Sequence, residues 1–223
     1  MCGRFLVTSE PAIMMETFDL DECPVIQPTW NAAPTQALPV VRMVGQHKRV
    51  DSLRWGLVPP WSRDPKIGSR MINARSETAA DKPSFRSALR QRRCVVVADG
   101  FYEWQRDGET KRPHCIRMRE GHPFGMAGLW ESWSGQDDEV LETFTILTTA
   151  PNELMAPIHD RMPVILPRSQ HDRWLAPDLT DPGQVSCLLR PFDSDQMMAF
   201  EVSSRVNSPR NNDPDCMRPA SEG

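Results

Sequence analysis

The chain has 223 residues, of which 39% are hydrophobic and 25% are charged, a composition typical of a soluble globular protein and not of a disordered one. Its longest uninterrupted apolar run covers residues 94–98. A membrane-spanning helix needs at least about 18 such residues, and the first residues lack the apolar segment of a secretory signal. The sequence therefore predicts no membrane partner and no export. We expect a cytoplasmic protein, associated with the nucleoid if the source is bacterial.

Charge is unevenly distributed along the chain. The 26 basic and 30 acidic residues give a net charge of −4, but residues 61–93 contain nine basic and three acidic residues. That stretch carries +6, so the rest of the chain carries −10. The basic residues are 22 Arg and 4 Lys, and arginine presents a planar fork of donors that matches phosphate oxygens. A basic face on an acidic chain is compatible with a polyanionic partner, although an ordinary solvated surface explains the charges equally well.

Hydrophobic periodicity and the 21 prolines divide the chain into short elements. Ser9 is the expected N-cap of the first helix. In chain order we predict a strand over residues 2–7, a helix over 10–18, strands over 38–44 and 50–55 around a turn at 45–48, a helix over 84–92, strands over 94–98, 114–118, 124–129 and 144–149, helices over 169–175 and 182–189, and a strand over 199–202.

This order of elements lacks regular β-α-β alternation and therefore indicates an α+β fold. We expect a single β-rich domain over residues 1–208, with mixed, mainly antiparallel twisted sheets and short flanking helices. Residues 209–223 are polar and rich in proline, so they are predicted to form a C-terminal tail.

The six cysteines form no C-x-x-C pair and have no zinc-type spacing with the five histidines, so we predict no metal site. Disulfides are not expected without a secretory signal. Cys94 and Cys115 lie in apolar, strand-like segments and are expected in the core.

Cys2 is chemically different from the other cysteines. A small second residue favours removal of Met1, which leaves Cys2 with a free α-amine beside its thiol. That amine has a pKa of about 7.7–8.0, against about 10.4 for lysine, so part of it is neutral near pH 7 and able to condense with an aldehyde. The thiol then closes onto the imine carbon as a five-membered thiazolidine, a ring closure favoured by proximity. By itself, however, a cysteine at position 2 is more often an ordinary residue.

Three further segments carry candidate catalytic side chains. Asn73 and Arg75 lie two residues apart, on one side of an extended segment. Glu103 follows an apolar strand among aromatic residues, near a predicted strand end, where burial raises a carboxyl pKa and suits it to proton transfer. His159, a residue type that commonly serves as a general acid or base, precedes Arg161. Taken singly, each of these residues is better explained by a structural role: Asn73 as a turn cap, Glu103 as a partner of an arginine and His159 as a core residue.

Six motifs occur together and in a fixed order: MCGRF, WGLVP, NARSET, DGFYEW, HDRMPVIL and VSSRVN. In this respect the chain, over residues 2 to 216, resembles the SRAP (SOS response-associated peptidase) family. The resemblance implies an SRAP-type domain that binds single-stranded DNA in the DNA damage response. It also implies a covalent DNA–protein crosslink to abasic sites through the N-terminal cysteine, whose thiazolidine shields the lesion.

The resemblance implies a role for each candidate catalytic residue. Cys2 supplies the amine and the sulfur to the sugar aldehyde. Asn73 holds the ring-opened sugar, Glu103 positions or deprotonates the α-amine, and His159 acts as the general acid on the sugar oxygen. The same Glu103 and His159 are expected to assist a peptidase activity that removes Met1, although a host aminopeptidase gives the same product.

The resemblance also implies a set of DNA contacts. Phosphates are expected to be held by Arg4, Arg75 and Arg161, and a base is expected to stack on Trp61. Asn31 and Pro34 match a segment that lines the same groove. Some bacterial relatives carry two adjacent tryptophans where this chain has Trp61-Ser62, which leaves one ring for stacking.

Two other functions stay open on the residues alone. An N-terminal-nucleophile cysteine amidohydrolase also begins with Met-Cys-Gly, but the Asn-Gly dipeptide that such enzymes need is missing from this sequence. A binding module with an inert Cys2 is the second alternative. For the protein itself we expect a monomer that needs no cofactor and carries no clamp-binding motif.

Overall fold

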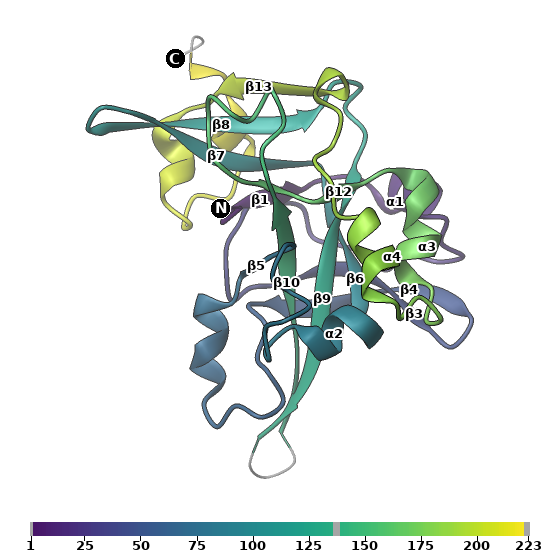
Figure 1. Cartoon of the computed structure of the whole chain (residues 1–223). Helices are drawn as coiled ribbons and strands as arrows, with labels where there is room; N and C mark the ends of the chain where they lie inside the picture. The colour runs from purple at the N-terminus through teal and green to yellow at the C-terminus, as the bar shows by residue number, and fades with distance from the viewer. Residues whose placement is uncertain (1, 136–138, 221–223) are drawn as a thin grey trace.

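The computed structural model describes residues 2–135 and 139–220, which form two sheets with short helices around them (Figure 1). The strands are β1 Phe5–Val7, β2 Thr29–Ala32, β3 Ala37–Val44, β4 His47–Trp55, β5 Asn73–Arg75, β6 Arg93–Ala98, β7 Gly100–Asp107, β8 Thr110–Met118, β9 Phe124–Ser134, β10 Val140–Thr149, β11 Met162–Pro163, β12 Ile165–Leu166 and β13 Met197–Glu201. The α-helices are α1 Pro11–Phe18, α2 Arg86–Gln91, α3 His171–Leu175 and α4 Pro182–Cys187. Short 3₁₀ helices cover Pro65–Arg70, Arg168–Gln170, Ser194–Gln196, Ser204–Asn207 and Pro214–Met217.

The first sheet runs in the order β13-β8-β7-β1-β2, and all its pairings are antiparallel. The second runs in the order β11-β10-β4-β3-β6-β9-β12, with β5 beside β10. Because β10 pairs with β9 as well as with β4, the middle of this sheet closes on itself as a small barrel. β10 is parallel to β4 and to β5. The prediction of an α+β fold with mixed, mainly antiparallel sheets is confirmed.

The barrel interior and the space between the two sheets form the main core. Every residue of β6 is buried, as its continuous apolar run predicts. Trp55 lies between two aromatic rings, with its ring centroid 5.0 Å from that of Phe5 and 6.3 Å from that of Phe144. Phe5 is on β1, so this contact packs the first sheet against the barrel and fixes the N-terminal segment beside it.

Most of the predicted elements are present, and their ends differ for local reasons. The hairpin of β3 and β4 is confirmed, but its turn is tighter because Gly45 adopts a positive φ of 62°. The prediction that Ser9 caps the first helix is wrong: Glu10 is the cap residue, and the Ser9 hydroxyl donates to Asp99 instead. Glu103 also differs from expectation, since it lies inside β7 and not near a strand end.

Residues 209–220 pack against the domain. Cys216 is fully buried, and the Asn212 side chain accepts a hydrogen bond from the backbone of Trp30 on β2 over 2.7 Å. A side-chain nitrogen of Asn31 donates to the Asn211 carbonyl over 2.8 Å. The C-terminal segment therefore covers the outer edge of the first sheet. Within the part of the chain that the structure describes, no helix is long and apolar enough to cross a membrane.

Candidate active site

Cys2 is fully buried beside the start of β1. Asn73 donates a side-chain hydrogen bond over 2.8 Å to the Cys2 carbonyl, and the Cys2 sulfur lies 4.0 Å from the Arg4 carbonyl. Burial raises the pKa of the Cys2 thiol, and the nearby Glu103 carboxylate raises it further. The thiol is therefore held in its protonated form.

β7 brings Glu103 to this cysteine. Phe5 pairs with Phe101, and the Tyr102 amide donates to the Arg4 carbonyl over 3.0 Å, so the same register sets Glu103 beside the N-terminal segment. Alternation along the strand turns Glu103 to the Phe101 face, toward the main core. Glu103 is 2% exposed, and this burial raises the pKa of its carboxyl, while the charge of His159 opposes the shift.

His159 reaches Glu103 from the turn between β10 and β11. Its Nε2 lies 3.9 Å from a Glu103 carboxylate oxygen. Its Nδ1 lies 2.9 Å from an Asp160 carboxylate oxygen and accepts a hydrogen bond over 3.0 Å from the Arg161 amide. Because the His159 side chain is 25% exposed, it connects the buried carboxyl to the molecular surface.

Asn73 enters the site from β5, which runs parallel to β10 with Asn73 paired to Ile146. Its side-chain nitrogen is used by the Cys2 carbonyl, but its buried side-chain oxygen has no hydrogen-bond partner among the residues that the structure describes. A buried acceptor of this kind is costly to leave unsatisfied. It is therefore suited to a hydroxyl of a bound ligand.

Four segments distant in sequence thus bring Cys2, Asn73, Glu103 and His159 together. The cluster combines a protonated thiol, a carboxyl with a raised pKa, an imidazole open to the surface and an oxygen acceptor. Such a set is able to move protons between a buried nucleophile and solvent.

The side chains of Arg4 and Asn31 turn to the C-terminal segment. Arg4 Nη1 donates to the Asn31 side-chain oxygen over 2.8 Å and to the Val206 carbonyl over 2.9 Å. The Asn31 side-chain nitrogen lies within hydrogen-bond distance of the carbonyls of Val206, Ser208 and Asn211. Asn31 is only 1% exposed. Both side chains therefore hold the end of the chain against β1 and β2.

Arg161 is close to the cluster, but its guanidinium is already bound. It forms two parallel bonds to the Glu77 carboxylate, of 2.7 and 2.8 Å, and donates to the Thr148 carbonyl over 2.6 Å. Sequence reasoning did not single out Glu77 or Asp160. Glu77 could have been found from its position inside the NARSET motif. Asp160 could have been found from its position directly after His159.

The other predicted DNA contacts lie at the surface. Trp61 is 58% exposed, Arg75 is exposed at the end of β5, and Pro34 is half-buried in the turn after β2. Most basic residues of the 61–93 stretch are also exposed, namely Arg63, Lys66, Arg70, Arg75, Lys82, Arg86 and Arg90. Arg93 is buried instead and donates to backbone carbonyls, among them that of Trp174.

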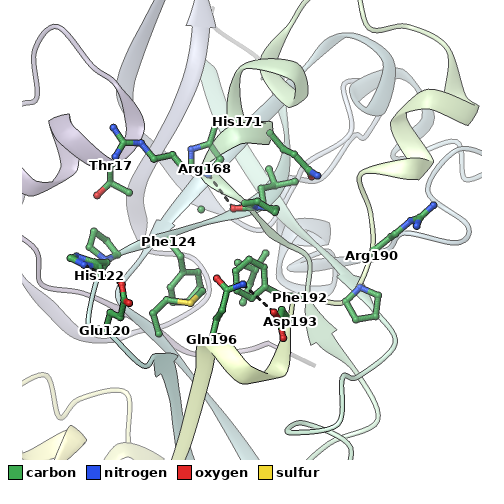
Figure 2. Close-up of a pocket in the computed structure, with 18 of the residues that line it drawn as sticks. Thr17, Glu120, His122, Phe124, Arg168, His171, Arg190, Phe192, Asp193 and Gln196 are labelled. Carbon is green, nitrogen blue, oxygen red and sulfur yellow. Dashed lines mark hydrogen bonds and ion pairs between the residues drawn. The ribbon is translucent and has the colours of Figure 1, made fainter.

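A separate cavity of about 650 Å³ lies between β9, β12, the α3 region and the segment before β13 (Figure 2). Phe124 and Phe192 line it, while charged side chains lie around it, with His122 and Arg190 on opposite sides. None of the ten predicted site residues lines this cavity. Across residues 2–135 and 139–220, no group of three or more His, Cys, Asp or Glu residues is placed to hold a metal ion.

Comparison with known proteins identifies the family of this chain. The profile of the family "SOS response associated peptidase (SRAP)" matches residues 1–209. The chain is 48% identical to abasic site processing protein YoqW of Bacillus subtilis, over 96% of this chain and 98% of that protein. It is 34% identical to abasic site processing protein HMCES of Xenopus tropicalis, over 86% of this chain and 66% of that protein. A crystal structure of a protein from Bacteroides thetaiotaomicron superposes with a TM-score of 0.89 and 28% identity, over 98% of this chain and 100% of the other. The chain therefore belongs to the SRAP family.

Proposed function

We propose that this protein detects abasic sites in single-stranded DNA and crosslinks to them through Cys2. The observation that carries the proposal is the convergence of Cys2, Asn73, Glu103 and His159 in one site that reaches the surface at His159. The names of the relatives YoqW and HMCES, abasic site processing proteins, support the same substrate class.

The reaction needs a free α-amine on Cys2, so hydrolysis of the Met1–Cys2 peptide bond comes first. Glu103 and His159, which belong to the same cluster as Cys2, are able to activate a water molecule and protonate the leaving amine. We assign this step to self-processing. Removal that proceeds equally well in a Glu103→Gln variant would instead assign it to a cellular aminopeptidase.

The crosslink forms in two steps. The neutral α-amine of Cys2 attacks C1′ of the ring-opened sugar, and loss of one water molecule gives an imine. The Cys2 sulfur then adds to the imine carbon, its proton passes to the nitrogen, and a thiazolidine ring closes. The product contains all atoms of the protein and the DNA except one water molecule.

Each neighbouring side chain has a part in these steps. His159 donates a proton to the sugar ring oxygen, which opens the ring to the aldehyde. Glu103 removes protons from the amine and returns them during dehydration, a task that suits a carboxyl whose pKa is raised by burial. The unsatisfied oxygen of Asn73 accepts a hydrogen bond from a sugar hydroxyl.

The DNA is held mainly by sequence-independent contacts. Arg75 and the other exposed basic residues of the 61–93 stretch bind the phosphates, and Trp61 stacks on a base. Arg161 joins them when Glu77 releases it. Phosphate contacts carry no sequence information, which suits a protein that must act wherever the lesion occurs.

The test is to mix the processed protein with a single-stranded oligonucleotide that carries one abasic site. We expect a band that survives denaturing electrophoresis and an intact mass equal to protein plus DNA minus one water. An oligonucleotide with a normal base at that position is the control. A protein that binds the DNA without a covalent adduct is a binding module, and one that hydrolyses glutamine instead is an amidohydrolase.

A further inference from the structure

The contact between Glu103 and His159 requires that the segment between β10 and β11, which carries His159, stays beside β7. We call this segment the His159 turn. β7 already pairs with β1 along one edge and with β8 along the other. β1 pairs with it at Gly100 and Phe101, and β8 pairs with it from Phe101 to Asp107. The contacts that join the His159 turn to β7 are made by side chains.

Gln105 makes such an attachment. It lies two residues after Glu103 on β7, so both side chains leave the same face of the strand. Its side-chain nitrogen donates over 3.0 Å to the carbonyl of Pro157, which lies two residues before His159. Two contacts therefore join β7 to the turn, Gln105 to Pro157 and Glu103 to His159, and their residues are two apart on both sides.

The orientation of the Gln105 amide is also fixed. Its oxygen accepts a hydrogen bond over 3.1 Å from Arg112, the residue directly opposite on β8. Arg112 itself lies 3.3 Å from Asp107 and 3.6 Å from Glu201, on the two strands beside β8. With the oxygen held by Arg112, the nitrogen is the end of the amide that faces Pro157.

The turn has its own internal structure, independent of Gln105. The Asn152 side chain accepts from the Met155 amide over 2.9 Å and donates to the Phe192 carbonyl over 2.8 Å. Met155 is fully buried, and its carbonyl accepts the amide of His159 over 2.9 Å. Loss of the Gln105 contact therefore changes how the turn approaches β7 without unfolding it.

We propose that Gln105 is a positioning residue that sets the distance between His159 and Glu103. The proposal rests on the proposed function for its effect on crosslinking, but not for its effect on the imidazole. Two charged groups of the described residues lie beside the His159 ring, namely Glu103 from β7 and Asp160 from the turn itself. A turn that moves away from β7 weakens the first of these contacts and keeps the second.

The experiment compares wild type, Gln105→Met and Gln46→Met. Methionine keeps the length of glutamine but donates no hydrogen bond, and Gln46 lies in the exposed β3–β4 turn, far from the site in the fold. Because a displacement of about 1 Å costs up to about a hundredfold in rate, we expect Gln105→Met to crosslink about tenfold to a hundredfold more slowly at saturating DNA. We expect its affinity for DNA to be unchanged, its pH–rate profile to be displaced, and Gln46→Met to match wild type.

A second readout does not depend on crosslinking. The ring nitrogens of His159 are followed by nitrogen NMR as a function of pH, and we expect the titration midpoint to move in Gln105→Met and not in Gln46→Met. Unchanged titration together with an unchanged rate would overturn the positioning role. If wild type forms no adduct, the proposed function fails, and the His159 titration alone decides the role of Gln105.

Discussion

Arg161 and Glu77 form a two-bond ion pair at the edge of the candidate site, with N–O distances of 2.7 and 2.8 Å. The Glu77 side chain is 51% exposed, whereas that of Arg161 is 15% exposed. The carboxylate thus occupies the position at which a phosphate would meet the guanidinium. The hydrogen bond from Arg161 lowers the pKa of Glu77, so the pair persists through neutral pH.

Glu77→Gln is therefore expected to bind single-stranded DNA more tightly than wild type, by a few-fold. The amide cannot form the ion pair, which frees Arg161 for a phosphate. The substitution also removes one negative charge from the edge of the candidate site. One further phosphate contact makes the dependence of log affinity on log salt steeper by about one. Fluorescence anisotropy at several salt concentrations measures both effects.

Glu16→Gln is the matched control, because Glu16 is exposed on α1 and makes the same change of charge. Equal effects of the two substitutions would show that net charge, and not release of Arg161, governs binding.

Cys2→Ala is expected to abolish the denaturation-resistant adduct and to leave salt-sensitive DNA binding intact. The proposed function assigns the phosphate contacts to other residues, so only the covalent step is expected to be lost. Cys2→Ser keeps the amine, so we expect an imine that borohydride traps but no sulfur-closed ring. Intact mass of each mixture measures the products. Cys187→Ala, at an exposed free cysteine, is expected to behave as wild type. A heat-stable adduct in Cys2→Ala would contradict the assignment.

Glu103→Gln is expected to slow adduct formation by about 10² to 10⁴, the range of general acid–base catalysis. It is also expected to change how stability depends on pH. Burial raises the pKa of Glu103 above its ordinary value of 4.5, so the folded protein binds this proton more tightly than the unfolded chain does. By linkage, wild type loses stability as pH rises from about 4.5 through the folded-state pKa, and the loss persists above it.

The Gln variant lacks that loss. Its Tm relative to wild type is therefore expected to increase between pH 4 and pH 8, as measured by thermal unfolding in matched buffers. A difference that stays constant with pH would show that the Glu103 carboxyl has the same pKa in both states.

The elements with strong patterns were predictable from the sequence. The continuous apolar run of β6 and the hairpin of β3 and β4 follow from residue type and spacing alone. Five strands were not predicted, namely β2, β5, β7, β11 and β12. For β5, β11 and β12 the reason is length, because strands of two or three residues are too short to show alternation. They exist because β10 and β9 offer them partners.

The residue types of the site were predictable from the sequence, but the hydrogen-bond and ion-pair partners of those residues were not. The motifs pointed to Cys2 and Glu103 as neighbours in function, yet the spacing of residues does not say which donors the chain itself uses. Arg161 is bound by a carboxylate 84 residues away, and Arg4 by the carbonyl of Val206, 202 residues away. Such contacts depend on the whole fold and leave no local signal.

Asn31→Ala is expected to lower the free energy of unfolding by about 1–3 kcal/mol, because it removes the side-chain donor to the partly buried carbonyls of Ser208 and Asn211, whereas the Val206 carbonyl keeps its bond from Arg4. Urea unfolding measures the loss, and proteolysis is expected to cut first within residues 205–217. Gln46→Ala in the exposed hairpin turn is the control. Normal stability with weakened DNA binding would instead make Asn31 a direct DNA contact.

Trp61→Ala is expected to weaken single-stranded DNA binding by about 1–3 kcal/mol, the contribution of one base stacked on an aromatic ring. The ring is 58% exposed, yet its segment is held in place: the Trp133 indole donates to the Ser62 carbonyl over 2.7 Å, and Thr143 accepts from the Val58 amide over 2.9 Å. A fixed backbone with an exposed ring is pre-organised for stacking, so removal of the ring costs affinity and little stability.

Anisotropy titration and thermal unfolding of the same samples separate these two effects. Trp61→Phe retains an aromatic face and is expected to recover most of the affinity. Val25 is 84% exposed, so the control Val25→Ala is expected to match wild type. The crosslinking rate at saturating DNA is expected to be unchanged in Trp61→Ala, because the proposed function assigns the ring to a neighbouring base and not to the reacting sugar. A rate that falls even at saturation would place Trp61 in the chemical step, and a large drop in Tm would make it a structural residue.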